Sequence, residues 1–246
     1  MQKLKAAAVI PARYASTRFP GKALAEINGR PMIIRVLEAV EKCDLIEDVY
    51  VATDDIRIKS AVESAGGRVI MTSAQHKTGT DRIAEAAAEI DANLIVNVQG
   101  DEPLIKGETI ARALKPFSTE HDLKMSTLKR KISVSEAQNP DVVKVITDKD
   151  DYALYFSRSA VPFYREVEAD EQQYYQHIGL YVYRSSFLLE FAEMESTPLE
   201  RAESLEQLRA LENGYQIKVI ETEAKLIGVD RRADIELVEE ELKKRV

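Results

Sequence analysis

Apolar and polar residues alternate along the N-terminal part of the chain in a pattern that predicts strands and helices in turn. Short apolar or β-branched runs predict strands at residues 5–12, 48–54, 68–72 and 92–103. Apolar residues at helical spacing predict helices at residues 31–43, 56–66 and 80–90. Because strands that alternate with helices of this length form βαβ units, the pattern predicts a mostly parallel sheet with helices on both faces.

Beyond about residue 118 the alternation loosens. Strand-like runs then follow one another without regular helices between them, at residues 122–132, 141–148, 152–159 and 174–184. A helix at 204–214, a strand at 215–222 and a charged helix at 232–246 complete the pattern. We therefore expect one α/β domain over residues 1–246, with a smaller mixed extension or lobe within about residues 120–200.

Positive charge is concentrated at the start of an otherwise acidic chain. The net charge is −8, yet residues 1–25 hold no acidic residue, and the first carboxylate is Glu26. The cations in this segment are Lys3, Lys5, Arg13, Arg18 and Lys22. A locally cationic loop in an acidic protein indicates a small, highly charged anionic ligand, and a solvated basic surface loop is the alternative. A pI near 5.2 argues against general nucleic-acid binding.

Composition narrows the setting further. No stretch approaches the roughly 20 apolar residues of a membrane span, and the N-terminal segment lacks the features of a signal peptide. The single cysteine, Cys43, excludes an intramolecular disulfide and lies in a helical pattern, which favours an unreactive thiol over a nucleophile. We expect a cytoplasmic protein that acts neither on nucleic acid nor on membranes.

Three chemically rich stretches follow predicted strands: "RYASTRFPGK", "TSAQHKTGTDR" and "QGDEP". Ligands of doubly wound sheets bind beyond the carboxyl ends of the strands. The first stretch combines backbone N–H groups, a glycine and three cations, which is the chemistry of a triphosphate cradle. It is not a P-loop, because Ser16 and Ala23 occupy the places of the first glycine and the final hydroxyl residue. The absence of GxGxxG after the first strand argues against a nicotinamide site.

Two aspartates are candidate ligands for Mg²⁺, which commonly takes one or two carboxylates together with phosphate oxygens. Asp101 ends a buried strand, and Asp230 follows an apolar stretch and a glycine in "LIGVDRRAD". Each has a structural alternative: Asp101 as the cap of a turn before Pro103, and Asp230 as the N-cap of the last helix. Together, in a chain with a cationic loop, they favour a metal–nucleotide site.

Long motifs of this sequence resemble the 3-deoxy-manno-octulosonate cytidylyltransferases, the CMP-Kdo synthetases. The similar stretches are "AVIPARYASTRFPGKAL", "TGTDRIAEA", "VNVQGDEPLI", "YFSRSAVPF", "HIGLYVYR" and "LEQLRALENG", collinear from about residue 6 to 230. The resemblance implies a nucleotide-diphospho-sugar transferase-like (Rossmann-like) fold, usually homodimeric, whose smaller lobe binds the sugar and mediates dimerisation. It also implies a Mg²⁺-dependent enzyme that converts CTP and Kdo into CMP-Kdo and pyrophosphate for lipopolysaccharide inner-core biosynthesis.

The resemblance also assigns roles to residues. Arg13, Arg18 and Lys22 would hold the CTP phosphates and, with Asp101, form the catalytic set. Asp101 and Asp230 would bind Mg²⁺. The remaining CTP-binding residues would be Pro11 and Ala12, through their backbone, and Arg82 and Gln99. The Kdo side would comprise Arg158, His177, Tyr181, Glu206 and Gln207.

Some of these roles have local alternatives. Arg158 is the expected partner of the Kdo carboxylate, because guanidinium and carboxylate pair in a bidentate geometry. His177 could equally be a hydrogen-bonded structural histidine, and residues 204–214 could be an ordinary amphipathic helix. The family loop commonly has Leu and Pro where this chain has Phe19 and Ala23, which leaves the cations untouched. "GVDRRADI" departs from the usual "GVDTPEDL", so Asp230 is the least secure transfer.

The expected mechanism is direct attack of the anomeric 2-hydroxyl of Kdo on the α-phosphorus of CTP. Positioning and electrostatic neutralisation would provide most of the catalysis, and no residue stands out as an obligatory general base. Two rival functions remain open on the sequence: a cytidylyltransferase for another acidic sugar, such as a sialic acid, and a nucleotide-binding regulatory protein without turnover. Intact Lys22 and Asp101 argue against the second rival.

Overall fold

The computed structural model describes residues 4–15, 18–168 and 170–244 and divides into two compact units. The first unit comprises residues 1–111, 183–192 and 225–246, and the second comprises residues 112–182 and 193–224. Each predicted strand has a counterpart in the structure, although most of the observed strands begin later or end earlier than the predicted ranges. The assignment of sugar binding and dimerisation to a smaller lobe stays a prediction.

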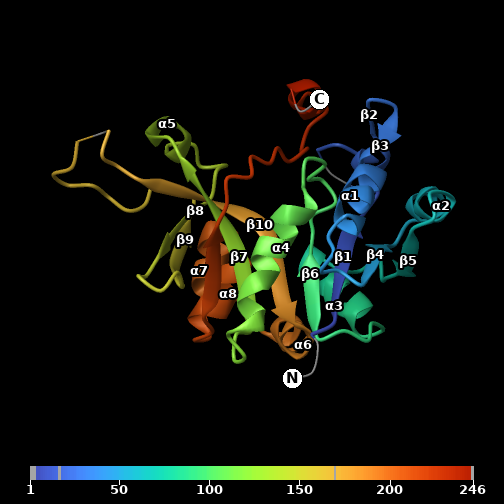
Figure 1. Cartoon of the computed structure of the whole chain (residues 1–246), viewed down its shortest axis with the longest axis horizontal. Coiled ribbons are helices and arrows are strands. Elements are labelled where there is room, and N and C mark those ends of the chain that lie inside the picture. The colour runs from blue at the N-terminus through green and yellow to red at the C-terminus, as the bar shows by residue number, and fades with distance from the viewer. Residues whose placement is uncertain (1–3, 16–17, 169, 245–246) are drawn as a thin grey trace. The chain divides into compact units, whose positions relative to one another are not determined.

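Parallel strands form the centre of the first unit (Figure 1). They are β1 (Ala6–Ala12), β4 (Asp48–Thr53), β5 (Arg68–Met71) and β6 (Leu94–Asn97), and they lie in the order β6-β1-β4-β5. β1 and β6 are the most buried of them, and residues Ala7–Ile10 of β1 are fully excluded from solvent. In the register, Ala12 pairs with Thr53 and Val9 with Asn97, so the carboxyl ends of these strands meet at one edge.

Helices connect these strands as the pattern predicts. They are α1 (Met32–Glu41), α2 (Ile56–Ser64) and α3 (Gly79–Ala87). Polar side chains fix where two of them begin. The Asp55 carboxylate accepts the Arg57 N–H at the start of α2, and Thr78 and Asp81 form a reciprocal capping box at the start of α3.

The C-terminal segment returns to the first unit through an apolar cluster. This cluster contains Ile27, Met32, Leu104, Val229 and Val238, with Phe19 packed against it. Its members come from the cationic loop, from the short strand β2 (Glu26–Ile27), which pairs with β3 (Arg30–Pro31), from α1, and from the final helix α9 (Asp234–Lys244). Burial of this surface brings Val229, and with it Asp230, beside the loop that carries Lys22.

The second unit mixes parallel and antiparallel pairing. β11 (Ile217–Glu221) pairs with β7 (Met125–Ile132) in parallel, and β10 (Tyr174–Arg184) is the other neighbour of β7. β8 (Lys144–Thr147) pairs antiparallel with both β10 and β9 (Ala153–Ser157). This is the mixed extension that the loosened pattern predicts, and β7, β8, β9 and β10 are labelled in Figure 1.

The sequence pattern missed several helices. These are α4 (Gly107–Leu114), α5 (Val134–Ala137), α6 (Ser185–Glu193) and α7 (Pro198–Glu203), in addition to the 3-10 turns η1 (Lys22–Leu24) and η2 (Lys115–Ser118). The expectation of strands without helices between them was therefore wrong in part. α5 and α7 are too short to show a helical period. α5 begins with a capping box at Ser133, and at the start of α7 the Glu200 carboxylate accepts the Thr197 N–H. The predicted helix at 204–214 is shorter, as α8 (Gln207–Glu212).

Two composition-based expectations can be compared with the structure. Among the described residues, no helix is both long enough and apolar enough to cross a membrane. Cys43 is buried at 3% exposure, and this burial raises the pKa of its thiol. A raised pKa lowers the thiolate fraction, so the thiol is unreactive, as predicted.

Gly100 tests how tightly the ends of β6 and β1 are packed. A Cβ atom at Gly100 would lie 2.8 Å from the backbone carbonyl oxygen of Pro11, which cannot rotate away. We expect Gly100→Ala to lower the free energy of unfolding by about 1–3 kcal/mol, measured by urea denaturation. Gly179→Ala is the matched control, because a Cβ atom there meets nothing within 4 Å. Equal stability of the two variants would contradict this account.

Candidate nucleotide and sugar sites

The cationic loop leaves the carboxyl edge of the first unit directly after β1. Pro11 is half-buried and Ala12 is buried at the end of the strand, whereas Arg13 and Arg18 are exposed on the loop. Ser16 and Thr17 lie outside the described residues. The loop therefore starts in the place where ligands of parallel α/β sheets bind.

A stack of side chains that the sequence analysis missed supports this loop. The Gly21 N–H donates to the Tyr14 carbonyl over 2.9 Å, and Gly21 has a left-handed φ of 73°. Its missing side chain leaves room for the Tyr14 ring, from which a Cβ atom would be only 3.1 Å away. On the Tyr14 ring lies the Arg57 guanidinium, 3.3 Å from the centroid, and Arg57 also pairs with Asp55.

Four charged side chains from distant parts of the sequence converge next to this loop. Lys22 Nζ lies 2.5 Å from Asp101 Oδ2 and 3.5 Å from Asp230 Oδ1. It also donates to the Val229 carbonyl over 3.2 Å. Arg18 Nη2 lies 3.1 Å from the same Asp230 oxygen. We call Arg18, Lys22, Asp101 and Asp230 the charge cluster; it unites two predicted phosphate ligands with both predicted metal ligands.

The structure decides between the alternatives for Asp230. The last helix begins at Asp234, whose carboxylate accepts the N–H groups of Asp230 and Arg231 over 2.8 and 2.7 Å. Asp230 is therefore not the N-cap of that helix, and its own carboxylate faces Arg18 and Lys22. The Asp101 side chain likewise pairs with Lys22, while its carbonyl accepts the Val229 N–H.

A third carboxyl group, Glu102, lies beneath the charge cluster. Its Oε2 atom is buried and has no hydrogen-bond partner within residues 4–15, 18–168 and 170–244, and its Oε1 atom would be 3.3 Å from a Cβ atom at Gly228. Burial, with a smaller contribution from the negative charge of Asp101, raises the pKa of Glu102 to about 8. No local pattern predicts this environment; the only indication is the position of Glu102 in "QGDEP".

The donor set of the cluster fits Mg²⁺. Among the described residues, no group of three or more histidine, cysteine or acidic side chains could hold a metal ion by itself. Asp101 and Asp230 do, however, share a single positive group, the Lys22 ammonium. Two carboxylates that converge on one cation match a metal that takes its remaining ligands from water and substrate phosphates.

Arg82 and Gln99, both predicted on the nucleotide side, lie near strand ends of the first unit. Arg82 is buried at 4% exposure; its Nη1 donates to Thr72 Oγ1, and its Nη2 lies 3.5 Å from Asp54 Oδ2. Asp54 Oδ1 is buried and finds no hydrogen-bond partner in the part of the chain that the structure describes. Gln99 Nε2 donates to Asn97 Oδ1 over 2.9 Å. These contacts hold both side chains against their strand neighbours.

The second unit contains the residues predicted for the sugar, beginning with His177 on β10. Its Nε2 lies 3.0 Å from Thr127 Oγ1, and this oxygen also lies 3.0 and 2.8 Å from the carbonyls of Ile178 and Leu180. The single Thr127 proton serves a carbonyl, so the histidine Nε2–H donates to Thr127. Burial lowers the pKa of His177 to about 3. These contacts match the structural alternative, and its role toward the sugar stays a prediction.

Aromatic rings join His177 to its neighbours. The Phe156 ring of β9 meets the His177 ring edge-on at 5.0 Å, and the Tyr181 ring lies 5.3 Å away. Lys144 pairs in the sheet register with Ser157 of β9 and with Gln176 of β10, and it donates to the carbonyl of Arg158. The structure thus brings Arg158, His177 and Tyr181 into one region of the second unit.

Arg158 is held by backbone oxygens. Its Nε donates to the Glu203 carbonyl over 2.8 Å, its Nη1 to the Pro140 carbonyl over 3.1 Å, and its N–H to the Glu203 carboxylate over 2.9 Å. The fully buried Lys144 donates to the carbonyl of Arg158 over 2.6 Å. Lys144 and Glu203 carried no signal in the sequence analysis, because only packing reveals what they support.

Glu206 and Gln207, both predicted to bind the sugar, lie at the start of α8 and differ in exposure. Glu206 is half-buried at the start of the helix, while Gln207 is 4% exposed. Gln207 Nε2 is a buried donor without a partner among the described residues. A buried unpaired donor is costly, and a ligand oxygen or a water molecule would satisfy it.

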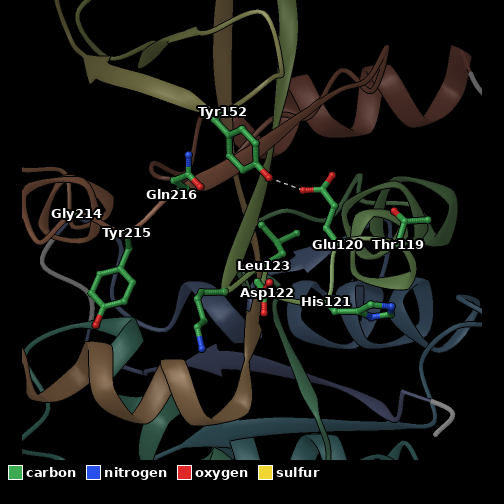
Figure 2. Close-up of a pocket in the computed structure, with 10 residues that line it drawn as sticks. Thr119, Glu120, His121, Asp122, Leu123, Tyr152, Gly214, Tyr215 and Gln216 are labelled. Carbon is green, nitrogen blue, oxygen red and sulfur yellow. Dashed lines mark hydrogen bonds between the residues drawn. The ribbon is translucent and has the colours of Figure 1, made fainter. Parts of the chain in front are cut away.

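A separate cavity of about 530 Å³ lies in the second unit (Figure 2). The cavity is lined by residues 119–124, which precede β7, by residues 214–216, which precede β11, and by Tyr152. It therefore lies at the amino ends of these two parallel strands. Figure 2 shows the Tyr152 hydroxyl donating to Glu120, a bond that raises the pKa of Tyr152 to about 12. None of the predicted site residues lines this cavity, and ligands of such sheets bind at the opposite edge.

Comparisons with known proteins agree with this geometry. Residues 7–221 match the family model described as Cytidylyltransferase. The 3-deoxy-manno-octulosonate cytidylyltransferase of Geobacter metallireducens is 54% identical, over 97% of this chain and 98% of its own length. The chain belongs to the 3-deoxy-manno-octulosonate cytidylyltransferase family. The relative from Geobacter sulfurreducens is also 54% identical, over 96% of this chain and 98% of its own.

Solved structures of this and related families show the fold. The structure of CMP:2-keto-3-deoxy-manno-octonic acid synthetase complexed with CTP is 40% identical and superposes with a TM-score of 0.94, over 98% of this chain and 100% of that one. A 4-diphosphocytidyl-2C-methyl-D-erythritol synthase from Anaerococcus prevotii shares the fold alone, at 17% identity and a TM-score of 0.65, over 98% of this chain and 100% of that one. The predicted membership of the 3-deoxy-manno-octulosonate cytidylyltransferase family and the predicted fold class are confirmed, whereas the roles of individual residues stay predictions.

His177 has a clear consequence for acid stability. Its folded pKa of about 3 lies below its ordinary value of 6.5, so the unfolded chain binds the proton first and stability falls as the pH drops below 6.5. The variant His177→Gln keeps a donor for Thr127 but does not titrate. Between about pH 7 and pH 5, we expect its free energy of unfolding to fall by about 2 kcal/mol less than that of the wild type. Urea denaturation at both pH values measures the difference. His121→Gln, at an exposed histidine of the same unit, should follow wild type; an unchanged slope in His177→Gln would refute the assignment.

Proposed function

We propose that this protein transfers CMP from CTP to Kdo, releasing CMP-Kdo and pyrophosphate, and that the product serves lipopolysaccharide inner-core biosynthesis. The observation that carries the proposal is the charge cluster at the end of β1, in a chain that is 54% identical to named enzymes of this activity. The cluster combines donors for phosphate with acceptors for a metal ion, which is what nucleotidyl transfer requires.

The loop cations bind the triphosphate in this proposal. Arg13 and Arg18 are exposed at the end of the strand, and Lys22 lies at the base of the loop. The 2-hydroxyl of Kdo attacks the α-phosphorus, its proton is released, and the bond to the β-phosphate oxygen breaks to give pyrophosphate. Because negative charge accumulates on the leaving pyrophosphate, positive side chains fixed beside it stabilise the transition state.

Asp101 and Asp230 are the residues that hold Mg²⁺ in this proposal, and Mg²⁺ when bound supplies positive charge and lowers the pKa of a coordinated hydroxyl. The backbone of Pro11 and Ala12 lines the base, and Arg82 and Gln99 lie on the nucleoside side. The backbone at Pro11 is held close to Gly100, which supports a rigid wall for the base.

The second unit provides the groups for an acidic sugar. Arg158 carries a guanidinium that can pair with the Kdo carboxylate, and its backbone bonds fix its orientation. Gln207 brings a buried amide donor that lacks a partner among the described residues. We place Tyr181, His177 and Glu206 on the same sugar-binding side.

Pyrophosphate release with CTP and Mg²⁺ tests the reaction and its acceptor. We expect release with Kdo, and only background release with N-acetylneuraminate or without a sugar. Release with N-acetylneuraminate instead would assign the chain to another acidic sugar. Binding of CTP without release in any arm would favour a regulatory nucleotide-binding protein.

Asp101→Asn tests the proposed metal ligand. The substitution keeps the side-chain volume but removes the negative charge. We expect turnover to fall by about two decades or more, because the metal ion that stabilises the transition state loses a charged ligand. Circular dichroism should show an unchanged fold. Asp91→Asn, at an exposed aspartate paired only loosely with Lys5, is the matched control and should keep wild-type turnover. Near-normal turnover of a folded Asp101→Asn variant would reject this role.

We also propose that the protein is a cytoplasmic homodimer. The second unit exposes Phe163 at 86%, the most exposed large apolar side chain among the described residues, together with Leu154 at 59%, and we place the contact with the second copy there. Phe163→Asp is therefore expected to shift the mass measured by light scattering toward the monomer. Leu45→Asp, at a side chain that is 53% exposed in the first unit, should leave the mass unchanged. A wild-type monomer, or a dimeric Phe163→Asp variant, would contradict the proposal.

A further inference from the structure

Lys22 occupies the position between the two carboxylates that a bound cation would take. Its ammonium lies 2.5 Å from Asp101 Oδ2 and 3.5 Å from Asp230 Oδ1. We infer that Lys22 holds the place of the divalent cation in the nucleotide-free protein, and that CTP opens the Asp101–Asp230 pair to the cation by drawing Lys22 onto its phosphates. The inference rests on the proposed function and adds to it a coupling between nucleotide and metal.

The hydrogen bonds of Lys22 set the carboxylates and the phosphates in competition. Lys22 donates to Asp101 Oδ2 and to the Val229 carbonyl 3.2 Å away, and its ammonium also lies 3.5 Å from Asp230 Oδ1 as an ion pair. An ammonium has three donors, so phosphate oxygens that take more than one of them draw Lys22 away from these acceptors. The carboxylates and the phosphates therefore compete for the same donors.

The backbone stays in place during such an exchange. Lys22 begins the turn η1, its neighbour Ala23 is buried, and Val229 is fully buried in the apolar cluster that also contains Ile27. Only the flexible four-carbon stem of Lys22 needs to move, which is a low-cost motion for a lysine. Both carboxylates remain where they are, and without Lys22 their like charges favour a replacement cation.

Arg18 cannot perform the same function. Its contact with Asp230 joins side chains that are 64% and 51% exposed, so solvent screens the pair. Lys22 and Asp101 are 18% and 28% exposed, and their attraction is therefore less screened. Movement of the Lys22 side chain therefore changes the electrostatic potential at Asp101, where the metal ion would bind.

The inference predicts opposite effects on two ligands. Lys22→Met should bind Mn²⁺, used as a spectroscopically visible probe, about tenfold more tightly than wild type in the absence of nucleotide, because its competitor is gone. The same variant should bind CTP about tenfold more weakly in metal-free buffer, because a phosphate ligand is lost. A purely structural role of Lys22 would weaken both.

Electron paramagnetic resonance measures free Mn²⁺, and calorimetry measures CTP binding in EDTA. Lys22→Arg keeps the positive charge and should retain the weak Mn²⁺ binding of wild type, while Lys5→Met controls for loss of a lysine outside the cluster. Lys22→Gln is the alternative if the methionine variant does not fold.

The outcomes separate this inference from the proposed function. Wild-type protein that fails to bind CTP would overturn the proposed function itself. If wild type binds CTP but Lys22→Met binds Mn²⁺ no more tightly, Lys22 does not hold the cation position. If Mn²⁺ binding tightens while CTP binding is unchanged, Lys22 does not move to the phosphates, and the coupling is overturned.

Discussion

The ion pair between Lys22 and Asp101 is the interaction on which the nucleotide side depends. It connects a loop after the first strand to the end of β6, across 79 residues of sequence. Through the Val229 carbonyl, the same lysine also joins a segment 207 residues away. Without these contacts, the two aspartates would face each other without a cation between them. In our proposal, this pair is the contact that the nucleotide exchanges for the divalent cation.

Rigid supports surround this exchangeable centre. Tyr14 lies between Gly21 and the guanidinium of Arg57, and the apolar cluster holds Val229 in a fully buried position. Close packing of this kind limits the backbone to one arrangement, so that charge rearrangement takes place in side chains alone. Glu102, buried and unpaired under the cluster, adds further negative potential to the centre whenever it is ionised.

The second unit uses buried polar groups in another way. Lys144 donates its ammonium hydrogens to the carbonyls of Asn139, Val142 and Arg158, and the Thr127 hydroxyl, within 3.0 Å of two carbonyls of β10, donates its one proton to this pair. These bonds satisfy groups that would be costly to bury unpaired. They also fix the backbone around Arg158 and His177, so the residues expected to meet the sugar stand on an ordered frame.

The sequence alone determined the parallel α/β architecture, the cationic loop after the first strand and the candidate carboxylates, because apolar periodicity and residue chemistry are local properties. The apolar pattern did not predict helices shorter than about two turns, such as α5 and α7, because so few residues show no helical spacing of apolar positions. The tertiary structure decided that Asp230 faces Lys22 instead of capping α9, that Glu102 is buried, and that Arg57 stacks on Tyr14. Those outcomes depend on which distant segments pack together, and long-range packing sets distances and burial that no local pattern contains.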